Sequence, residues 1–254
     1  MKELLSNVAK NFDPYSFSAR VKPAFFIVLP IALVFFVWYE PSKTFAGGII
    51  TLLSTFGVIQ YAANLMSSKG NVLQSKLFKK WGASPTTIIM RHTDDTIDKH
   101  TKKRLFTALT TKCSDLKFPT VEEEKEAPED ADEVYKSAGN FLKENSRDTK
   151  KYPLVFKELV AYGISRNTRA FKGLGILISL VTLALSIFLL WFNYLYDSQT
   201  IIIEIINIAA IEELILPIFL SIFLYVWIFT ITEKDVEIRA YAYAKALLAV
   251  GEKL

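Results

Sequence analysis

The chain has 254 residues, of which 51% are hydrophobic and 22% charged, and its mean hydropathy is +0.27. It is therefore too apolar for an ordinary soluble domain and too rich in charge to lie wholly inside a membrane. Its formal net charge is +4, and its single cysteine, Cys113, excludes a disulfide within the chain.

Four stretches of the sequence are long and apolar enough to cross a hydrocarbon core of roughly 30 Å, which takes about 20 helical residues. They are residues 23–39, 44–66, 173–196 and 214–232, and the last has its earliest start at Ile201. The short "EPSK" segment joins the first two into a helical hairpin, and the last two form a second hairpin. Residues 1–22 are too polar and aromatic for a cleavable signal peptide.

The placement of basic residues predicts the orientation of these spans. Of the 30 Lys and Arg residues, only Lys43 lies in a segment that would be outside if both termini are cytoplasmic. We therefore expect a multi-pass protein with both termini in the cytoplasm. Cys113 then lies in a reducing compartment.

The region between the second and third spans, residues 67–172, is large enough for a small domain with its own core. Ser84 followed by Pro85 predicts one helix start, and Thr120 with Glu123 predicts a capping box at another. Apolar residues recur there at helical spacing, and no alternating run predicts a strand. The stripes are Leu105, Phe106, Leu109 and Cys113; Val134, Tyr135, Ala138, Phe141 and Leu142; and Leu154, Val155, Leu159 and Val160.

After the fourth span, Val236, Ala240, Ala244, Leu247 and Leu248 share one helix face, which we expect to dock on the inner domain or on a neighbouring subunit. The predicted fold is an all-α membrane protein with two transmembrane hairpins and a mainly helical cytoplasmic domain inserted between spans two and three. The predicted parts are a cytoplasmic segment (1–22), a hairpin (23–66), a ligand-sensing domain (67–172), a hairpin (173–232) and a cytoplasmic C-terminal helix (233–254).

The inner domain carries a basic surplus outside its "EEEKEAPEDADE" run, and three short strings there combine cations, hydroxyls, an amide and aromatic rings. Such groups bind phosphates and bases. The alternative for basic residues beside the membrane, Lys79, Lys80, Arg169 and Lys172, is attraction to anionic lipid. The candidate ligand-binding residues are Trp81, Thr86, Thr87, Arg91, Lys99, Lys102, Arg104, Tyr162, Arg166 and Asn167.

Polar residues within the apolar spans are candidates for a pore lining. Ser179, Thr182 and Ser186 form a stripe on the third span, although small hydroxyl residues are also the usual packing surface between membrane helices. On the fourth span, Glu212 and Glu213 would form a carboxylate ring at the outer mouth, or would lie in the headgroup zone. Further candidates on the same span are Ser221 and Tyr225.

No phosphate-binding loop, nucleophile elbow, "HExxH" string or paired cysteine ligands occur in the chain. The cluster of His92, Asp94, Asp95, Asp98 and His100 has its histidines eight residues apart, which does not suit one helix face. We therefore expect no enzyme activity, no metal and no cofactor. A solvated, self-paired charge cluster explains these residues better.

Four strings, "WGASPTTIIMRHTDDTIDKHTKKR", "FPTVEEE", "DADEVYKSAGNFLKENSRDTKKYPLVFKEL" and "YGISRN", resemble the inner region of bacterial four-span proteins of anti-phage systems. The resemblance is greatest to the pore-forming membrane effector of the Hailong system, and next to four-span effectors of CBASS-type cyclic-oligonucleotide signalling.

This resemblance implies a homo-oligomeric ion channel, with a tetramer favoured, in the bacterial inner membrane. A nucleotide-derived ligand made by a partner nucleotidyltransferase would gate the channel from the cytoplasm. The outcome would be membrane depolarisation and abortive infection. The alternative is a non-conducting, membrane-anchored sensor or scaffold that binds an anionic ligand or partner.

Overall fold

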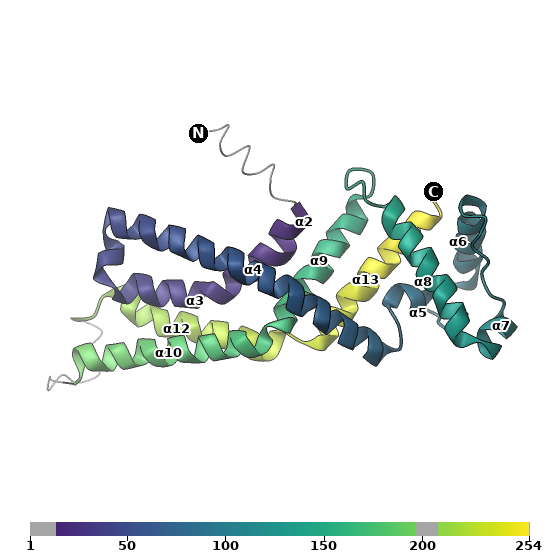
Figure 1. The fold of residues 1–254 in the computed structure, drawn as a ribbon. Helices are drawn as coiled ribbons and strands as arrows, with labels where there is room; N and C mark the ends of the chain where they lie inside the picture. The colour runs from purple at the N-terminus through teal and green to yellow at the C-terminus, as the bar shows by residue number, and fades with distance from the viewer. Residues whose placement is uncertain (1–13, 197–207, 254) are drawn as a thin grey trace. The chain divides into compact units, whose positions relative to one another are not determined.

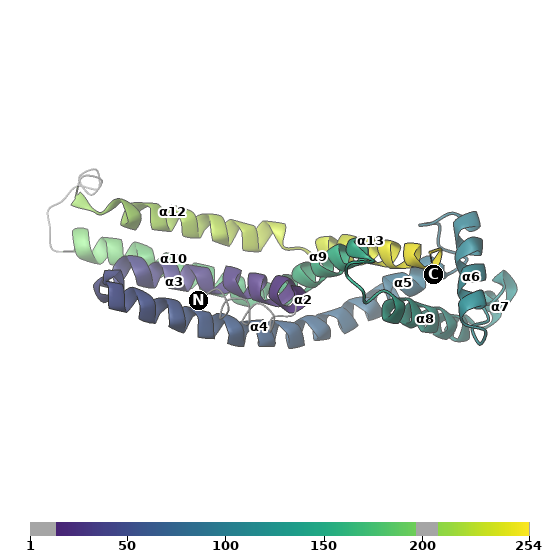
Figure 2. The same cartoon turned by 90° about the horizontal axis from the view of Figure 1, so that it is seen from above.

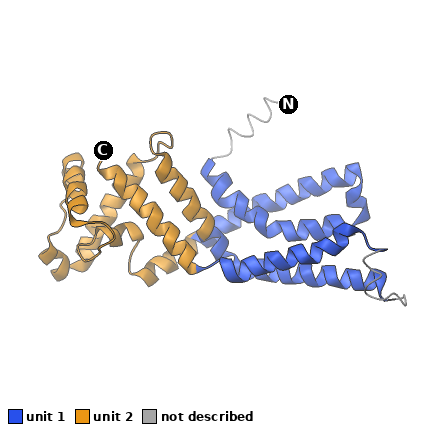
Figure 3. Ribbon diagram, turned by 180° about the vertical axis from the view of Figure 1, so that it is seen from behind, with its two compact units in different colours: residues 1–70, 166–232 blue, residues 71–165, 233–254 orange. Residues whose placement is uncertain are grey.

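The computed structural model describes residues 14–196 and 208–253, and every regular element within these ranges is helical (Figure 1). The predicted all-α class is confirmed for this part of the chain. Contacts divide the chain into two compact units (Figure 3): unit 1 takes in the chain up to Gly70 and Arg166–Thr232, and unit 2 takes in Asn71–Ser165 and Glu233–Leu254. The predictions for residues 1–13 and for a span start at Ile201 lie outside the described residues.

Unit 1 holds the most apolar helices. It contains α2 (Pro14–Ser16), a π-helical turn (Phe17–Val21), α3 (Lys22–Trp38), a 3-10 turn (Glu40–Lys43), the first part of α4 (Phe45–Trp81), the end of α9 (Pro153–Ala170), α10 (Lys172–Tyr194), α12 (Ile211–Tyr225) and a second π-helical turn (Val226–Thr230). Among the described residues, four helical segments are long and apolar enough to cross a membrane, and each overlaps one of the four predicted spans.

The second apolar helix is longer than the span predicted for it. The sequence loses its apolar character after Met66, but α4 continues as one helix to Trp81. It ends there because Gly82 adopts a left-handed conformation, with φ of +94°, that residues with a side chain rarely adopt. A single helix thus carries both an apolar segment and a polar, basic one.

Helices α3, α10 and α12 pack against one another in unit 1. One cluster joins Ile27 and Val28 of α3 to Trp227, and α4 adds Ile59 and Met66 to it. The Trp227 ring is completely buried and lies over Gly175 of α10, where an added Cβ would come within 2.3 Å of the ring. Gly175 therefore allows the close approach of these two elements.

Unit 2 is a bundle of shorter helices. It contains the end of α4, α5 (Pro85–Met90), α6 (Lys99–Lys112), α7 (Val121–Glu126), α8 (Pro128–Asn145), the first part of α9 and α13 (Glu233–Gly251). Helix α13 packs on α5, α6 and α8. Its Leu247 and Leu248 share a core with Leu105, Leu109 and Leu142, so the C-terminal helix completes the core of this unit.

The local signals for two helix starts are confirmed. The Ser84 side chain accepts a hydrogen bond from the backbone N–H of Thr87, with Pro85 at the first helical position of α5. Thr120 and Glu123 form the expected capping box at α7. Both caps satisfy N–H groups that have no partner within their own helix.

The chain passes between the two units at three places, and two of them fall inside a continuous helix. The boundary after Gly70 lies within α4, and the boundary after Ser165 lies within α9. The third precedes Glu233, the first residue of α13. Helical hydrogen bonds therefore continue through the first two boundaries.

The contact between Gly175 and Trp227 predicts the effect of one methyl group. Gly175→Ala overfills the contact and lowers the free energy of unfolding by about 1–3 kcal/mol. The matched control is Gly173→Ala on the same helix, where an added Cβ meets nothing within 4 Å and alanine favours the helix. Thermal unfolding in detergent should show a lower midpoint for Gly175→Ala alone; equal midpoints would contradict the packing.

Candidate ligand-binding site

A pocket of about 470 Å³ lies along α6 in unit 2. Its volume falls within the range of small-ligand sites. Basic, hydroxyl and aromatic side chains line it together. The lining residues are His92, Thr93, Lys99, Lys102, Lys103, Phe106, Thr107 and Val121.

The pocket offers free cations beside a flat aromatic surface. Lys99 and Lys103 are exposed on consecutive turns of α6, and no ion pair forms to either among the described residues. The Phe106 ring stacks on Phe118 with centroids 4.1 Å apart and planes at 6°, and His92 meets its edge at 5.9 Å. Phe106 is therefore held in a fixed orientation.

The third lysine of the pocket differs from the other two. Lys102 is only 5% exposed, and its ammonium donates hydrogen bonds to the backbone carbonyls of Arg91 and Asp94. Burial lowers the pKa of this group. Lys102 therefore fixes the loop before α6, and its ammonium is already occupied within the protein.

The N-terminus of α6 is also occupied. Asp98 accepts hydrogen bonds from the backbone N–H groups of His100 and Thr101, and from the Thr101 hydroxyl at 2.6 Å. The Thr101 hydroxyl, followed by its N–H, lowers the pKa of Asp98 to about 2, so the carboxylate is ionised at neutral pH. An anion in the pocket would therefore meet the lysine side chains and not a bare helix end.

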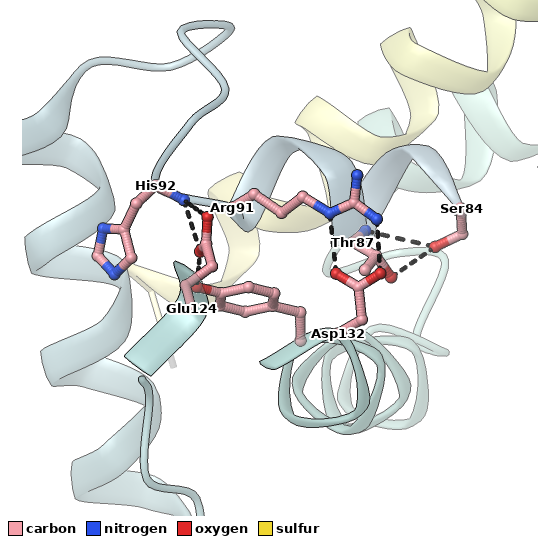
Figure 4. A network of polar contacts seen from close by, with 7 residues as sticks. Ser84, Thr87, Arg91, His92, Glu124 and Asp132 are labelled. Carbon is pink, nitrogen blue, oxygen red and sulfur yellow. Dashed lines mark hydrogen bonds and ion pairs between the residues drawn. The ribbon is translucent and has the colours of Figure 1, made fainter. Parts of the chain in front are cut away.

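The loop between α5 and α6 is fixed by an ion pair to α8 (Figure 4). The Arg91 guanidinium donates from Nε to Asp132 Oδ1 at 2.8 Å and from Nη2 to Oδ2 at 2.5 Å, in bidentate geometry. This bond raises the pKa of Arg91. Arg91, which we predicted to bind ligand, instead joins two helices of its own unit.

A second contact holds the other side of this loop. The Glu124 carboxylate is 7% exposed and accepts the backbone N–H of His92 at 2.8 Å and the hydroxyl of Tyr135 at 2.5 Å (Figure 4). Burial and the bond to Glu124 both raise the pKa of Tyr135. The His92 ring lies at hydrogen-bond distance, 2.9 Å, from the Pro119 carbonyl. The wall of the pocket is thus built from satisfied polar groups.

These features define the chemistry that the pocket can perform. The Lys99 and Lys103 ammonium groups can attract an anion such as phosphate, Phe106 supplies an aromatic ring, and Thr93 and Thr107 provide hydroxyls. Within the described residues, no group of three or more His, Cys, Asp or Glu side chains could hold a metal ion. The pocket thus places cationic, hydroxyl and aromatic groups next to one another.

The other predicted ligand residues of unit 2 lie in different surroundings. Thr86 and Thr87 are buried under α8 and α13, and Trp81 packs in a cluster with Leu77 and Tyr162. The Tyr162 hydroxyl donates to Gln74. Arg104 pairs with Glu252 at 3.2 Å. Of the ten predicted residues, the structure therefore brings only Lys99 and Lys102 to this pocket.

Arg166 and Asn167 belong to unit 1, where both are buried. The Asn167 side chain donates to the Ala19 carbonyl at 2.7 Å and accepts hydrogen bonds from Arg166. An added Cβ on Gly70 of α4 would come within 2.0 Å of the Asn167 side-chain oxygen. This contact joins α9, α4 and the turn before α3. Lys172, beside it in sequence, binds the carbonyls of Ile228 and Ile231.

The predicted pore residues of α10 are buried inside one chain. Ser179 and Ser186 are completely buried and Thr182 is 6% exposed, on a helix that packs against α3 and α12. The Thr182 hydroxyl donates a hydrogen bond to the backbone carbonyl of Ile178, four residues earlier on the same helix. Burial of this kind favours the packing alternative for the α10 stripe.

The predicted residues of α12 divide between buried and exposed positions. Glu213 is 9% exposed and accepts the Tyr194 hydroxyl at 2.6 Å, which ties the start of α12 to the end of α10. Glu212, Ser221 and Tyr225 are exposed. Their role as pore-lining residues stays a prediction.

Six lining residues were not among the predicted ligand-binding residues: His92, Thr93, Lys103, Phe106, Thr107 and Val121. The sequence places Phe106 in an apolar core stripe, and it does pack against that core, but it also lines the pocket. The spacing of Lys99, Lys103 and Thr107, one turn apart, was the available signal, because such residues share a helix face.

Comparisons of the chain with protein-family models, with curated proteins and with solved structures found no match. A functional assignment therefore depends on the chemistry of the pocket, the apolar spans and the resemblance described above. These three features are the basis of the function proposed below.

The Glu124 contact predicts a stability effect. Glu124→Ala leaves the His92 N–H and the Tyr135 hydroxyl without their partner, at about 1–3 kcal/mol for each buried group. We expect faster hydrogen exchange in Pro85–Met90 and Pro128–Asn145, measured by mass spectrometry. The control Glu122→Ala changes an exposed neighbour on the same helix. Unchanged protection in Glu124→Ala would contradict this role.

Proposed function

We propose that the protein is a homo-oligomeric ion channel of a bacterial inner membrane, gated by a nucleotide-derived ligand bound on unit 2. The observation that carries this proposal is that α4 and α9 each continue without a break through one of the three places where the chain passes between the units. A ligand that prefers one arrangement of unit 2 would act on the apolar helices through these two continuous helices. Its effect on the pore equilibrium equals its difference in affinity for the two states.

The arrangement in the membrane follows from charge. Of the 30 Lys and Arg residues, 29 lie in the segments 1–22, 67–172 and 233–254, while Lys43 lies between α3 and α4. Both termini and unit 2 are thus proposed to be cytoplasmic, with two membrane hairpins on either side of the inserted domain.

The ligand is proposed to be an oligonucleotide, or a smaller nucleotide signal, supplied by a partner nucleotidyltransferase. Lys99 and Lys103 would neutralise its phosphates, and a base would stack on Phe106. The resemblance to anti-phage effectors supports this ligand class, and it supports depolarisation and abortive infection as the outcome. No reaction is proposed, so the protein is assigned a binding role.

Conduction requires more than one copy. Helices α3, α10 and α12 pack through apolar and small side chains, with Val34, Leu216 and Leu220 in one cluster between them. A ring of copies, with a tetramer favoured by the resemblance, would enclose the path between them.

One observation favours the alternative, a membrane-anchored sensor that does not conduct. The hydroxyl stripe of α10, Ser179, Thr182 and Ser186, is buried inside the chain, so these residues pack against other helices and do not face a pore in this arrangement. A sensor would use the same pocket and the same helices but would pass its signal to a partner protein. Current through a purified bilayer separates the two functions.

The pocket predicts a charge-reversal effect. Lys99→Glu combined with Lys103→Glu should weaken the binding of short cyclic or linear oligonucleotides at least about tenfold, because two phosphate contacts become repulsive. The matched control is Lys136→Glu with Lys150→Glu, which makes the same charge change at exposed positions outside the pocket. Fluorescence anisotropy with labelled oligonucleotides in detergent measures the affinity, which should also fall with added salt.

The same variants test gating. Oligonucleotide should evoke current from the unmodified protein and the control in a planar bilayer, and none from the pocket variant. Binding that is equal in all three proteins would contradict the assigned site. A silent bilayer, with binding intact, would contradict the channel and leave the sensor.

A further inference from the structure

Helix α4 places small and polar side chains on the side that its own chain leaves uncovered. The residues that pack within unit 1, Ile59, Ala63, Met66 and Gly70, lie on the opposite side. In both Figures 1 and 2, α4 lies at the edge of the unit 1 helices. The uncovered positions recur at steps of three and four residues and are all exposed; we term them the α4 polar face: Ser54, Gly57, Tyr61, Asn64 and Ser68.

Where α4 crosses a membrane, four residues of this face, Ser54, Gly57, Tyr61 and Asn64, lie at the depth of the hydrocarbon core. Lys43 and Lys69 bracket the apolar part of the helix, so its midpoint falls near residue 56. At 1.5 Å per residue, Asn64 is about 12 Å from that midpoint, within half of a core of roughly 30 Å. Gln60, half-buried, lies one turn before Asn64. In the described part of the chain, neither amide has a hydrogen-bond partner, which is costly in lipid.

Gly57 independently indicates that another helix packs against this face of α4. An added Cβ there would meet nothing within 4 Å, so no contact inside the chain requires a glycine. A glycine within a helix costs about 1 kcal/mol relative to alanine. Small residues such as this one allow the close approach of another membrane helix.

The rest of the exposed α4 surface differs in chemistry. Phe45, Ile49, Leu52 and Phe56 are large, apolar and exposed, as a lipid-facing surface should be. The α4 polar face instead repeats with a mean step of about 3.5 residues, the period of helices that pack at about 20°. Asparagine and glutamine amides are both donors and acceptors, so identical faces can pair around a symmetry axis.

We propose that the α4 polar face meets the same face of α4 in neighbouring copies of the chain, around the axis of the oligomer. The occupant of the face is thus a second copy, and the amides of Gln60 and Asn64 face that copy or the water of the path. This inference rests on the proposed channel, and it assigns the pore lining to α4 in place of the α10 stripe.

Single cysteines test the contact in membranes, in a Cys113→Ser background. Gly57→Cys and Asn64→Cys should each give cross-linked dimers, with oxidation and with a longer bismaleimide reagent, because copies of the same position meet at the axis. Two controls, Leu52→Cys on the apolar side of α4 and Ile218→Cys on α12, are exposed in the chain and should stay monomeric on denaturing gels.

A bulky residue provides a second measurement. Gly57→Leu has room inside its own chain, so membrane insertion and the unfolding midpoint should stay unchanged while the oligomer dissociates on size exclusion. Absence of dimers at both Gly57→Cys and Asn64→Cys, or equal dimers at Leu52→Cys, overturns the contact. Cross-linked dimers in a protein that never conducts would support the α4 contact and contradict the channel. Ligand-evoked current without cross-linked dimers would support the channel and contradict the α4 contact.

Discussion

The structure depends on the continuity of helix α4, a single helix that carries an apolar segment followed by a polar, basic segment. Its first part carries large apolar residues such as Leu52 and Phe56, and its last part carries lysines and ends at Gly82. Every backbone N–H and C=O between these parts is satisfied within the helix, so no loop is needed where the solvent changes. The second helix that passes through a unit boundary is α9, with Arg166 and Asn167 directly after the boundary. Both residues are buried, and the Asn167 side chain lies beside Gly70 of α4.

The sequence predicted those features that depend on neighbours along the chain. The four spans follow from apolar length, and the caps at Ser84 and Thr120 follow from residues three positions apart. It did not predict which polar residues of distant segments would pair. Arg91 meets Asp132 across 41 positions, and nothing in either string says that the pair will form. The sequence does not distinguish a basic loop residue that is free to bind a ligand from one that forms an ion pair with a carboxylate of its own chain.

The lysines of α6 show why residue type alone does not define a site. Lys99, Lys102 and Lys103 lie within five consecutive residues, and all are cations in the same basic string. Lys102 points inward to two carbonyls and is buried, whereas Lys99 and Lys103 remain exposed. The difference follows from the helical rotation of 100° per residue relative to a core that the sequence does not locate. Only the position of the core separates the structural cation from the two that are free to bind.

The same reasoning applies to the polar stripes in the spans. Both α10 and α4 carry small and hydroxyl residues at helical spacing, and the pattern is equal evidence for packing and for a pore. Ser179 and Ser186 face the inside of the chain, where they let α10 approach α3 and α12. Ser54, Gly57 and Asn64 face away from it. The two stripes therefore differ in which side of the helix their own chain covers, and that side depends on contacts between distant segments that the sequence does not show.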